Sequence, residues 1–453
     1  MPASTSVFCV EGRRRGGVIV LASGAAAPEA FAAEELRRYV KRLTGAAVPV
    51  AARAPCDDAR FALSVGEAAW ACVPRAASLR RGLSDDGFVL YADARGLAIA
   101  GASPRGTLNG VYHFLAEQGC RWLFPGSRNE IVPRRKTLRI EPGTRREQPD
   151  LELRGICFFG MERRHLKAVR EVLDWMSKNR LNTVMTSLNR PAKYMPWAIL
   201  WKEVGPALLP EIKKLGMILD ISEHQMVHFF PPSHCRRHPE WYAANAAGVR
   251  VKPSAKAEGW QICYSNPGAV RALGDAMVAY LREHREAQII GTWPNDGYGF
   301  CQCPGCRRPG AVLKAINAVA ARIERARPDV TVEYLSYTRE TSEVPDSIAQ
   351  RRNVSVLVAN PRVAPAWLAK SRRTGARGVY RLDYSLADNS AQRGHLPLFF
   401  DYAARICRET REEGMRGILP FYIGLDAWWR SGLNLYAMGR CAWDADTTGD
   451  DLI

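Results

Sequence analysis

The chain has 453 residues, of which 47% are hydrophobic and 24% charged, and its formal net charge is +18. This length and composition are those of a globular protein with two or three cores rather than of a disordered chain. No apolar run reaches the length of a membrane span, and the basic residues are scattered instead of forming one stripe, so we expect no membrane and no nucleic-acid partner. No secretory signal is visible at the N-terminus, so we expect a cytoplasmic protein.

Residues 1–145 are predicted to form a small α/β domain, because short apolar stretches alternate with amphipathic ones. The predicted strands are Gly17–Ala22, Phe61–Val65, Gly87–Tyr91 and Leu97–Ala100, followed by three shorter ones. Helices are predicted at Ala27–Leu43 and Thr107–Gly119. The segment Pro142–Pro149 is rich in glycine, proline and arginine and is interpreted as a linker.

Residues 150–446 repeat a strand and a helix in regular alternation. Eight apolar stretches read as strands: Leu153–Phe159, Thr183–Thr186, Met217–Ile221, Ile289–Trp293, Val330–Ser336, Val354–Val358, Val379–Asp383 and Ile418–Ile423. The helices between and after them are predicted at His165–Lys178, Ala198–Leu215, Ala269–Glu286, Val312–Arg325, Ala364–Arg372, Leu398–Glu413 and Leu433–Trp443. Eight such units predict a closed (β/α)₈ TIM barrel, so the fold class is α/β. Residues 447–453 are expected to begin a C-terminal region that is truncated here.

Several motifs of the N-terminal part resemble the accessory domain that precedes the barrel in bacterial α-glucuronidases and β-hexosaminidases. They are A-A-E-E-L-R-R-Y-V-K-R-L-T-G (Ala32–Gly45), G-T-L-N-G-V-Y-H-F-L (Gly106–Leu115) and G-C-R-W-L-F-P-G (Gly119–Gly126). The resemblance implies a non-catalytic domain in front of a glycoside hydrolase barrel.

The barrel part resembles a large bacterial family whose members follow such a domain, some of them endo-β-N-acetylglucosaminidases. The matching stretches are H-P-E-W-Y-A (His238–Ala243), Q-I-C-Y-S-N-P (Gln261–Pro267), P-N-D-G-Y-G-F-C-Q-C-P-G-C (Pro294–Cys306) and A-W-D-A-D (Ala442–Asp446). The resemblance implies a glycoside hydrolase with a carbohydrate substrate, acting by a retaining mechanism in which the substrate's acetamide oxygen attacks the anomeric carbon. Such chemistry needs no cofactor.

The acidic groups for this reaction are expected at the C-terminal ends of the strands, where TIM barrels carry their active sites. Asp296 follows the fourth strand and is predicted to be the acid or the group that orients the acetamide. Its pKa is expected to be raised by Trp293 and Tyr298, which should shield it from water. Glu223, after the third strand, is the next candidate acid, although an exposed loop carboxylate explains it as well.

Other polar and aromatic residues at the strand ends are expected to bind the sugar, because sugar rings stack on aromatic rings and hydrogen-bond through their hydroxyls. They are Asn295, His228, Trp293, Tyr337, Asp383, Asp426 and Trp428. Each of the aromatic residues could instead pack the end of the barrel, and the Asn-Asp-Gly run could be a simple turn.

Cys301, Cys303 and Cys306 supply three thiols within six residues. A structural zinc site takes four Cys or His ligands, and Cys263 or Cys235 could provide the fourth. The alternative is a group of reduced thiols that pack a loop.

Two other functions remain open at this point. A catalytically silent barrel would bind carbohydrate without hydrolysing it. An α-glucuronidase-like enzyme would need a basic residue for the uronate carboxylate, and Arg339 or Arg381 could serve.

Overall fold

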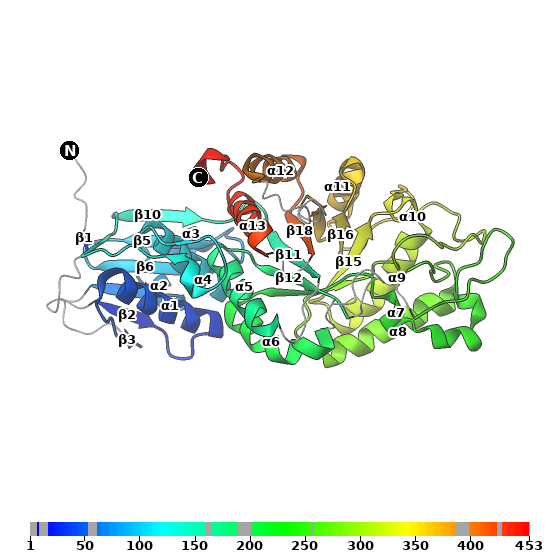
Figure 1. Cartoon of the computed structure of the whole chain (residues 1–453), viewed down its shortest axis with the longest axis horizontal. Helices are drawn as coiled ribbons and strands as arrows, with labels where there is room; N and C mark the ends of the chain where they lie inside the picture. Colours follow the sequence, from blue (N-terminus) through cyan, green and yellow to red (C-terminus); the bar gives the residue numbers. More distant parts are fainter. Residues whose placement is uncertain are drawn as a thin grey trace.

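The computed structural model describes residues 7–8, 17–52, 61–159, 165–188, 201–255, 258–385, 398–423 and 428–452. They form an N-terminal α/β unit and a closed barrel of eight parallel strands (Figure 1). The predicted fold class is therefore confirmed. None of the helices within these ranges is long and apolar enough to cross a membrane.

The N-terminal unit is built on a six-stranded sheet of order β10-β5-β6-β4-β2-β3. Its strands are β2 (Val18–Leu21), β3 (Val50–Ala51), β4 (Ala62–Val65), β5 (Phe88–Ala92), β6 (Gly96–Gly101) and β10 (Gly143–Glu147). Two small two-stranded sheets accompany it, made of β1 (Val7–Phe8) with β9 (Leu138–Arg139) and of β7 (Arg121–Trp122) with β8 (Glu130–Ile131). The helices are α1 (Ala27–Thr44), α2 (Glu67–Trp70), α3 (Ala76–Arg80) and α4 (Pro104–Glu117).

Local sequence signals set the ends of the two long helices of this unit. Helix α1 has Pro28 in its first turn and ends on Gly45, whose backbone is left-handed with φ 80°. Helix α4 begins at Ser103, whose Oγ accepts a hydrogen bond from the Gly106 N–H at 3.2 Å. These signals are visible in the sequence, and both helices lie within one or two turns of their predicted positions.

The predicted linker at Pro142–Pro149 is wrong. Residues Gly143–Glu147 form β10, which pairs antiparallel with β5 along five residues. The strand lies at the edge of the sheet, where charged side chains can remain in solvent while the backbone completes the ladder. The charged residues of this segment therefore belong to an edge strand and not to a linker.

The barrel consists of β11 (Leu153–Phe159), β12 (Thr183–Thr186), β13 (Ile218–Ile221), β14 (Ile289–Gly291), β15 (Thr331–Ser336), β16 (Val354–Val358), β17 (Gly378–Asp383) and β18 (Gly417–Ile423). Its long helices are α5 (Leu166–Lys178), α6 (Trp201–Leu215), α8 (Pro267–Glu283), α9 (Ala311–Ala326), α11 (Ala364–Thr374), α12 (Phe400–Glu413) and α13 (Trp428–Trp443). Shorter helices are α7 (Met226–Phe229) and α10 (Arg339–Ser342). Every predicted barrel strand is present, and three have the predicted limits.

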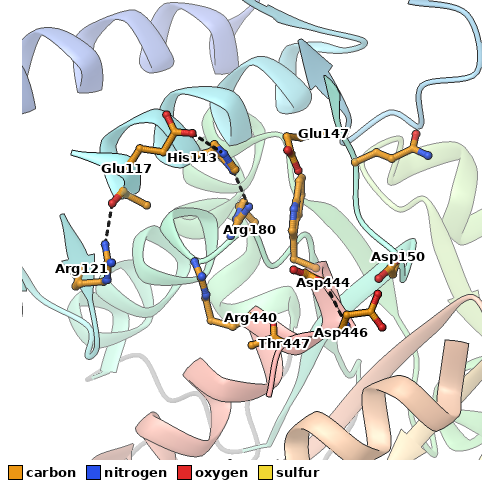
Figure 2. Close-up of a pocket in the computed structure, with 13 residues that line it drawn as sticks. His113, Glu117, Arg121, Glu147, Asp150, Arg180, Arg440, Asp444, Asp446 and Thr447 are labelled. Atoms are coloured by element: carbon orange, nitrogen blue, oxygen red, sulfur yellow. Dashed lines mark hydrogen bonds and ion pairs between the residues drawn. The ribbon is translucent and has the colours of Figure 1, made fainter. Parts of the chain in front are cut away.

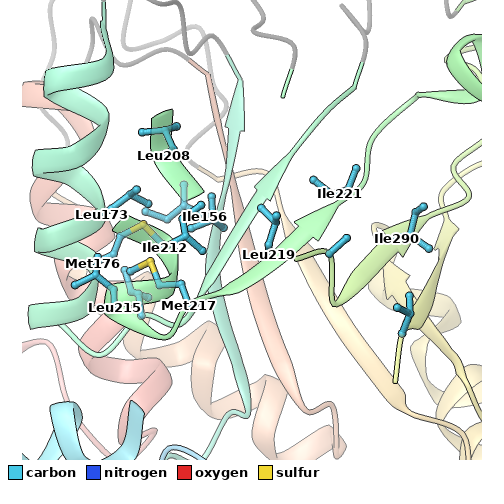
Figure 3. Packing of buried hydrophobic residues seen from close by; sticks show 14 of the residues in the cluster. Ile156, Leu173, Met176, Leu208, Ile212, Leu215, Met217, Leu219, Ile221 and Ile290 are labelled. Carbon is cyan, nitrogen blue, oxygen red and sulfur yellow. The ribbon is translucent and has the colours of Figure 1, made fainter. Parts of the chain in front are cut away.

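The strands are apolar on both faces because each face meets a different core. One face packs against the outer helices, because Leu219 and Ile221 of β13 belong to one buried cluster with residues of α5 and α6. Figure 3 shows part of this cluster, with Ile221 toward Ile290 of β14. The other face fills the barrel interior, where Ile218 belongs to a cluster with residues of β11, β12, β14 and β15 to β18. Alternate residues of β13 therefore point inward and outward.

The N-terminal unit is joined to the barrel by a buried polar network around Asp86. Its carboxylate pairs with Arg105 of α4 and with Arg154 of β11, the latter at 2.7 Å. The side-chain amide of Asn182 also donates to Asp86 at 2.6 Å, and Arg105 donates to the Gly216 carbonyl at 2.8 Å. Both arginines hold the pKa of Asp86 down, to about 2, against the opposing effect of its burial.

Candidate active site at the barrel mouth

Strand β13 carries an acidic group inside the barrel and a second one just after its C-terminal end. Asp220 lies on the inward face and is fully buried, and the Ser222 hydroxyl donates to one of its oxygens. Glu223 follows, with 1% of its surface exposed and a backbone φ of 110°. This φ is unusual for a residue with a side chain, so the packing around Glu223 must hold it there.

A third buried acid, Glu333, reaches the same region from the inward face of β15. The indole N–H of Trp293 donates to one of its oxygens at 2.8 Å. Gly291 of β14 leaves the space for Ser222 between the strands, since a Cβ at this glycine would lie 2.6 Å from the Ser222 oxygen. Among the described residues, Asp220 and Glu333 each keep one buried oxygen without a hydrogen-bond partner.

Burial determines the protonation of these three carboxyl groups. It raises the pKa of Glu223 to about 8, and the negative charges of Asp296 and Asp220 act in the same direction. Burial also raises the pKa values of Asp220 and Glu333, and the charge of Asp220 contributes to the shift of Glu333. The Cys157 thiol donates to Glu223 at 3.5 Å, and burial raises the pKa of this thiol too. A protonated carboxyl group is therefore held beside the barrel mouth at neutral pH.

Asp296 lies above this group, after the end of β14. Its side chain is 38% exposed, and one of its oxygens is 3.7 Å from Nε2 of His224. The Nδ1 of His224 lies 2.6 Å from the Pro294 carbonyl, so Nδ1 is the nitrogen that carries the proton in the neutral ring. Burial lowers the pKa of His224, although the Asp296 charge opposes this. Nε2 is then an acceptor that faces the carboxylate across a gap.

The shielding of Asp296 that the sequence led us to expect does not occur. Tyr298 is 82% exposed and cannot exclude water from the carboxylate. Trp293 is buried, and its polar edge points to Glu333. Two other aromatic residues, Tyr337 and Tyr384, interact electrostatically with Asp296. Burial raises their pKa values, and the Asp296 charge is a smaller cause in the same direction.

Asn295 and His228, which were predicted to bind the substrate, contact other parts of the protein. Asn295 is 2% exposed, and its side-chain amide donates to the Trp260 carbonyl at 2.9 Å. Its amide oxygen has no hydrogen-bond partner among the residues that the structure describes. His228 packs its ring on Tyr280 of α8, with 6.0 Å between the ring centroids. These contacts connect Asn295 and His228 to neighbouring loops and helices.

Asp383 lies at the end of β17, where its carboxylate accepts hydrogen bonds from the Ser385 N–H at 3.1 Å and the Tyr402 hydroxyl at 2.5 Å. Asp426 and the side chain of Trp428 lie outside the described residues. Of the predicted residues, Glu223, Asp296 and Tyr337 lie close enough for the Asp296 charge to act on the other two, and Trp293 packs on His224, which is next to Glu223.

The cysteine triplet is joined by Cys263, not by Cys235. The sulfur atoms of Cys263, Cys301, Cys303 and Cys306 all lie within 4.8 Å of one another. The Cys263 sulfur is 3.7 Å from that of Cys301 and 3.8 Å from those of the other two. A tetrahedron of sulfurs around zinc, with bonds of about 2.3 Å, has edges of about 3.8 Å. The four thiols thus form a group that can hold a structural metal ion.

Two family models match the chain. Residues 124–372, more than half of the sequence, match the family described as a domain of unknown function, DUF4838. The chain belongs to the DUF4838 family. Residues 15–114 of this DUF4838 protein also match the glycosyl hydrolase family 67 N-terminus. The resemblance seen in the sequence, an accessory domain of the glucuronidase type in front of a barrel, is confirmed.

Solved structures that share the fold of this DUF4838 protein include several glycoside hydrolases, whereas no curated protein sequence matches it. A GH115 4-O-methyl-α-glucuronidase with specificity for decorated arabinogalactans is 11% identical with a TM-score of 0.66, over 97% of this chain and 57% of that chain. The GH20 β-N-acetylhexosaminidase from Streptomyces coelicolor is 13% identical with a TM-score of 0.58, over 98% and 89%. The β-N-acetylhexosaminidase from Bacteroides fragilis is 11% identical with a TM-score of 0.57, over 98% and 90%. At these identities the likeness shows the fold, and the chain spans little more than half the length of the glucuronidase.

Sequence reasoning missed two polar groups in the barrel of this DUF4838 protein. Glu333 interrupts an otherwise apolar strand, T-V-E-Y-L-S, at a position that the alternation of β15 directs inward. An acid inside an apolar strand is unusual enough to be a signal. Cys157 offered no such signal, because a buried cysteine is common in cores.

Proposed function

We propose that the chain is a glycoside hydrolase whose substrate binds at the barrel mouth, between Glu223 and Asp296. The observation that carries the proposal is the contrast between these two acids. One is buried, with a pKa of about 8, and the other is partly exposed at the end of the next strand. An acid that keeps its proton beside a second carboxyl group is the arrangement that glycosidases use. The fold shared with glycoside hydrolases supports the same conclusion.

The substrate we favour is a β-N-acetylglucosaminide, because GH20 β-N-acetylhexosaminidases share the fold over most of their length. The acetamide oxygen would attack the anomeric carbon, and Glu223 would give its proton to the departing glycosidic oxygen. Asp296 would accept a hydrogen bond from the acetamide N–H and stabilise the positive charge that forms there. Water would then attack the anomeric carbon while Glu223 takes its proton back from that water. The bond to the acetamide oxygen would break, which regenerates the acetamide and leaves a hemiacetal with net retention. His224 could accept a hydrogen bond from a sugar hydroxyl through Nε2.

Asn295, Trp293, Tyr337, His228, Asp383, Asp426 and Trp428 stay in this proposal as binding or supporting residues. Residues 1–145 and 150–446 are likewise kept as the proposed domain limits. For the α-glucuronidase-like alternative, Arg381 is buried and pairs with Glu413 of α12 at 3.1 Å, so its charge already has a partner. That alternative has no support from this residue.

A catalytically silent carbohydrate-binding barrel is the second candidate. The observation in its favour is the burial of Glu223, which is only 1% exposed. A group that protonates a leaving oxygen must come within hydrogen-bond distance of it.

Turnover measurements on paired variants test both candidates. Aryl N-acetyl-β-glucosaminide, glucuronide and glucoside and a complex N-glycan are offered to the wild type, Glu223→Gln and Asp296→Asn. Each variant should lose a factor on the order of 10² in turnover of the preferred substrate. Asp346→Asn is the matched control, since this aspartate is 89% exposed and should tolerate the change. Binding without turnover would favour the silent barrel. If the wild type shows no binding and no turnover, both candidates are refuted.

We also propose that the four cysteines hold a structural zinc ion. Thiolates suit zinc, and the sulfur separations fit a tetrahedral site without rearrangement. Cys263 lies in the connection between β13 and α8, and the other three lie between β14 and α9. The ion would tie these two connections together next to Asp296 without taking part in the chemistry.

Metal analysis of protein purified under reducing conditions should find about one zinc per chain. Cys303→Ser should lower both zinc content and melting temperature. Cys72→Ser, an exposed thiol outside the cluster, is the control and should change neither. A metal-free protein whose melting temperature is unchanged by Cys303→Ser would leave only the packing interpretation.

A further inference from the structure

A cavity of about 500 Å³ lies between the N-terminal unit and the barrel, away from the barrel mouth. Figure 2 shows that its walls come from both parts of the chain: α4, β7 and the residues around β10 on one side, and the ends of α5 and α13 on the other. Most of the lining side chains are polar or charged. A cavity of this size has room for a molecule as large as a monosaccharide.

Arg180 occupies a position where the backbone would favour glycine. It follows the C-terminal end of α5 and has a φ of 61°. The Arg180 N–H donates to the Ser177 carbonyl at 3.0 Å and the Leu181 N–H to the Met176 carbonyl at 2.9 Å, which is the glycine-type helix end called a Schellman motif. The left-handed region is less favourable for a residue with a side chain than for glycine. An arginine at this position therefore suggests a role for its side chain.

The guanidinium of Arg180 is buried and, within the part of the chain that the structure describes, forms no ion pair. The side chain stacks over Trp443 at 4.4 Å from the ring centroid, and one N–H contacts Nδ1 of His113 at 3.2 Å. His113 in turn pairs through Nε2 with Glu117 at 3.2 Å. Within the described ranges, no carboxylate forms an ion pair with Arg180 or with Arg440, which lines the same cavity. Burial and the positive charge of Arg440 lower the pKa of Arg180, to about 9.

Most acids of the cavity wall are already engaged with other arginines. Glu117 pairs with Arg145 at 3.2 Å, outside the lining. Asp150 and Asp446 both pair with Arg411 of α12, at 3.1 Å and 2.6 Å. Among the described residues, neither Arg180 nor Arg440 is in an ion pair, although the charge of Glu147, on the same cavity wall, favours the charged form of Arg180. A buried charge without a close partner, such as that of Arg180, is costly.

We propose that this cavity binds a small hydroxylated oxyanion, either a sugar acid or a sugar phosphate, between Arg180 and Arg440. Guanidinium groups bind carboxylates and phosphates through paired N–H donors. Glu147 and Asp444, which also line the cavity, can accept hydrogen bonds from the hydroxyls of the same ligand. An anion on the two arginines would relieve their mutual repulsion.

Calorimetric titration of the whole chain with glucuronate, glucose 6-phosphate, inorganic phosphate and glucose tests this proposal. We expect glucuronate or glucose 6-phosphate to bind and glucose not to bind, and the stronger of the two identifies the anion. Arg440→Gln should weaken that binding about tenfold or more, because it removes charge-assisted hydrogen bonds. Arg373→Gln removes the same charge from an exposed site on α11 and should leave the affinity unchanged.

Asp296→Asn should also leave the affinity unchanged, so this test is independent of the chemistry proposed at the barrel mouth. The proposal is overturned if no anion binds at about 10 mM, which corresponds to less than about 3 kcal/mol of binding free energy. It is also overturned if Arg440→Gln has no effect, or if Arg373→Gln has the same effect. Equal affinity for inorganic phosphate and glucose 6-phosphate would overturn the role given to Glu147 and Asp444.

Discussion

The substitution Glu223→Gln should make the folded protein more stable at alkaline pH, although it should lower the proposed activity by a factor on the order of 10². The pKa of Glu223 rises from 4.5 in the unfolded chain to about 8 in the folded protein. Between these values the folded protein holds a proton that the unfolded chain has released. The stability of the wild type therefore falls as the pH rises through this window. At about 1.4 kcal/mol for each pKa unit, the loss approaches roughly 5 kcal/mol above about pH 8.

Glutamine has no proton to lose, so the variant escapes this loss. Its amide can still accept the hydrogen bond of Cys157, but an N–H group would then face the His224 N–H, which now lies 3.4 Å from the carboxylate. This contact should cost about 1 kcal/mol at every pH. The variant is thus expected to be slightly less stable than the wild type at pH 4 and more stable by several kcal/mol at pH 9.

Guanidinium denaturation followed by tryptophan fluorescence at pH 4, 7 and 9 gives the comparison. Glu283→Gln, an exposed glutamate on α8, is the control and should give a profile parallel to that of the wild type. If the Glu223→Gln profile is also parallel to that of the wild type, Glu223 does not hold a proton in the folded protein. It could then not be the acid of the proposed reaction.

Three further substitutions test the buried network around Asp86 and the packing around the buried acids of the barrel. Asp86→Ala should destabilise the protein by about 3–5 kcal/mol in urea unfolding, because it leaves two arginines without their shared carboxylate. In the wild type, the low pKa of Asp86 means that this stabilisation is present above about pH 4 and is lost as the pH falls through about 2, which acid titration by circular dichroism can follow. Trp293→Phe removes the indole donor from Glu333 and should cost about 1–3 kcal/mol, also measured by urea unfolding. Gly291→Ala should lower the melting temperature, since the new Cβ would lie 2.6 Å from the Ser222 oxygen.

The barrel could be predicted from the sequence because its strands are buried on both faces and are joined by amphipathic helices. Such strands appear as continuous apolar runs, and β11, β12 and β16 have their predicted limits. Strand β10 could not be predicted in the same way. Its burial is slight and its side chains are mostly charged, so that only its pairing with β5 shows it to be a strand.

The candidate site was predictable where it follows the strand ends and not where it lies inside the barrel. Glu223 and Asp296 were identified because they come directly after apolar runs. The proton-holding role of Glu223 depends on burial and, as a smaller cause, on the negative charges of Asp296 and Asp220, which the sequence does not arrange in space. The choice of Cys263 over Cys235 as the fourth thiol likewise depends on how two loops meet.

The buried network at Asp86 also explains how the N-terminal unit can contribute to a binding site. Because Asp86 holds residues of α4, β11 and the chain before β12 in one arrangement, the unit cannot shift on the barrel without exposing paired charges. The same arrangement sets His113 of α4 against Arg180, at the wall of the interdomain cavity. Neither part of the chain encloses that cavity alone. The N-terminal unit carries no proposed catalytic residue, but it would still complete a binding site. The polar interface at Asp86 would then serve to keep the unit in the position that this site requires.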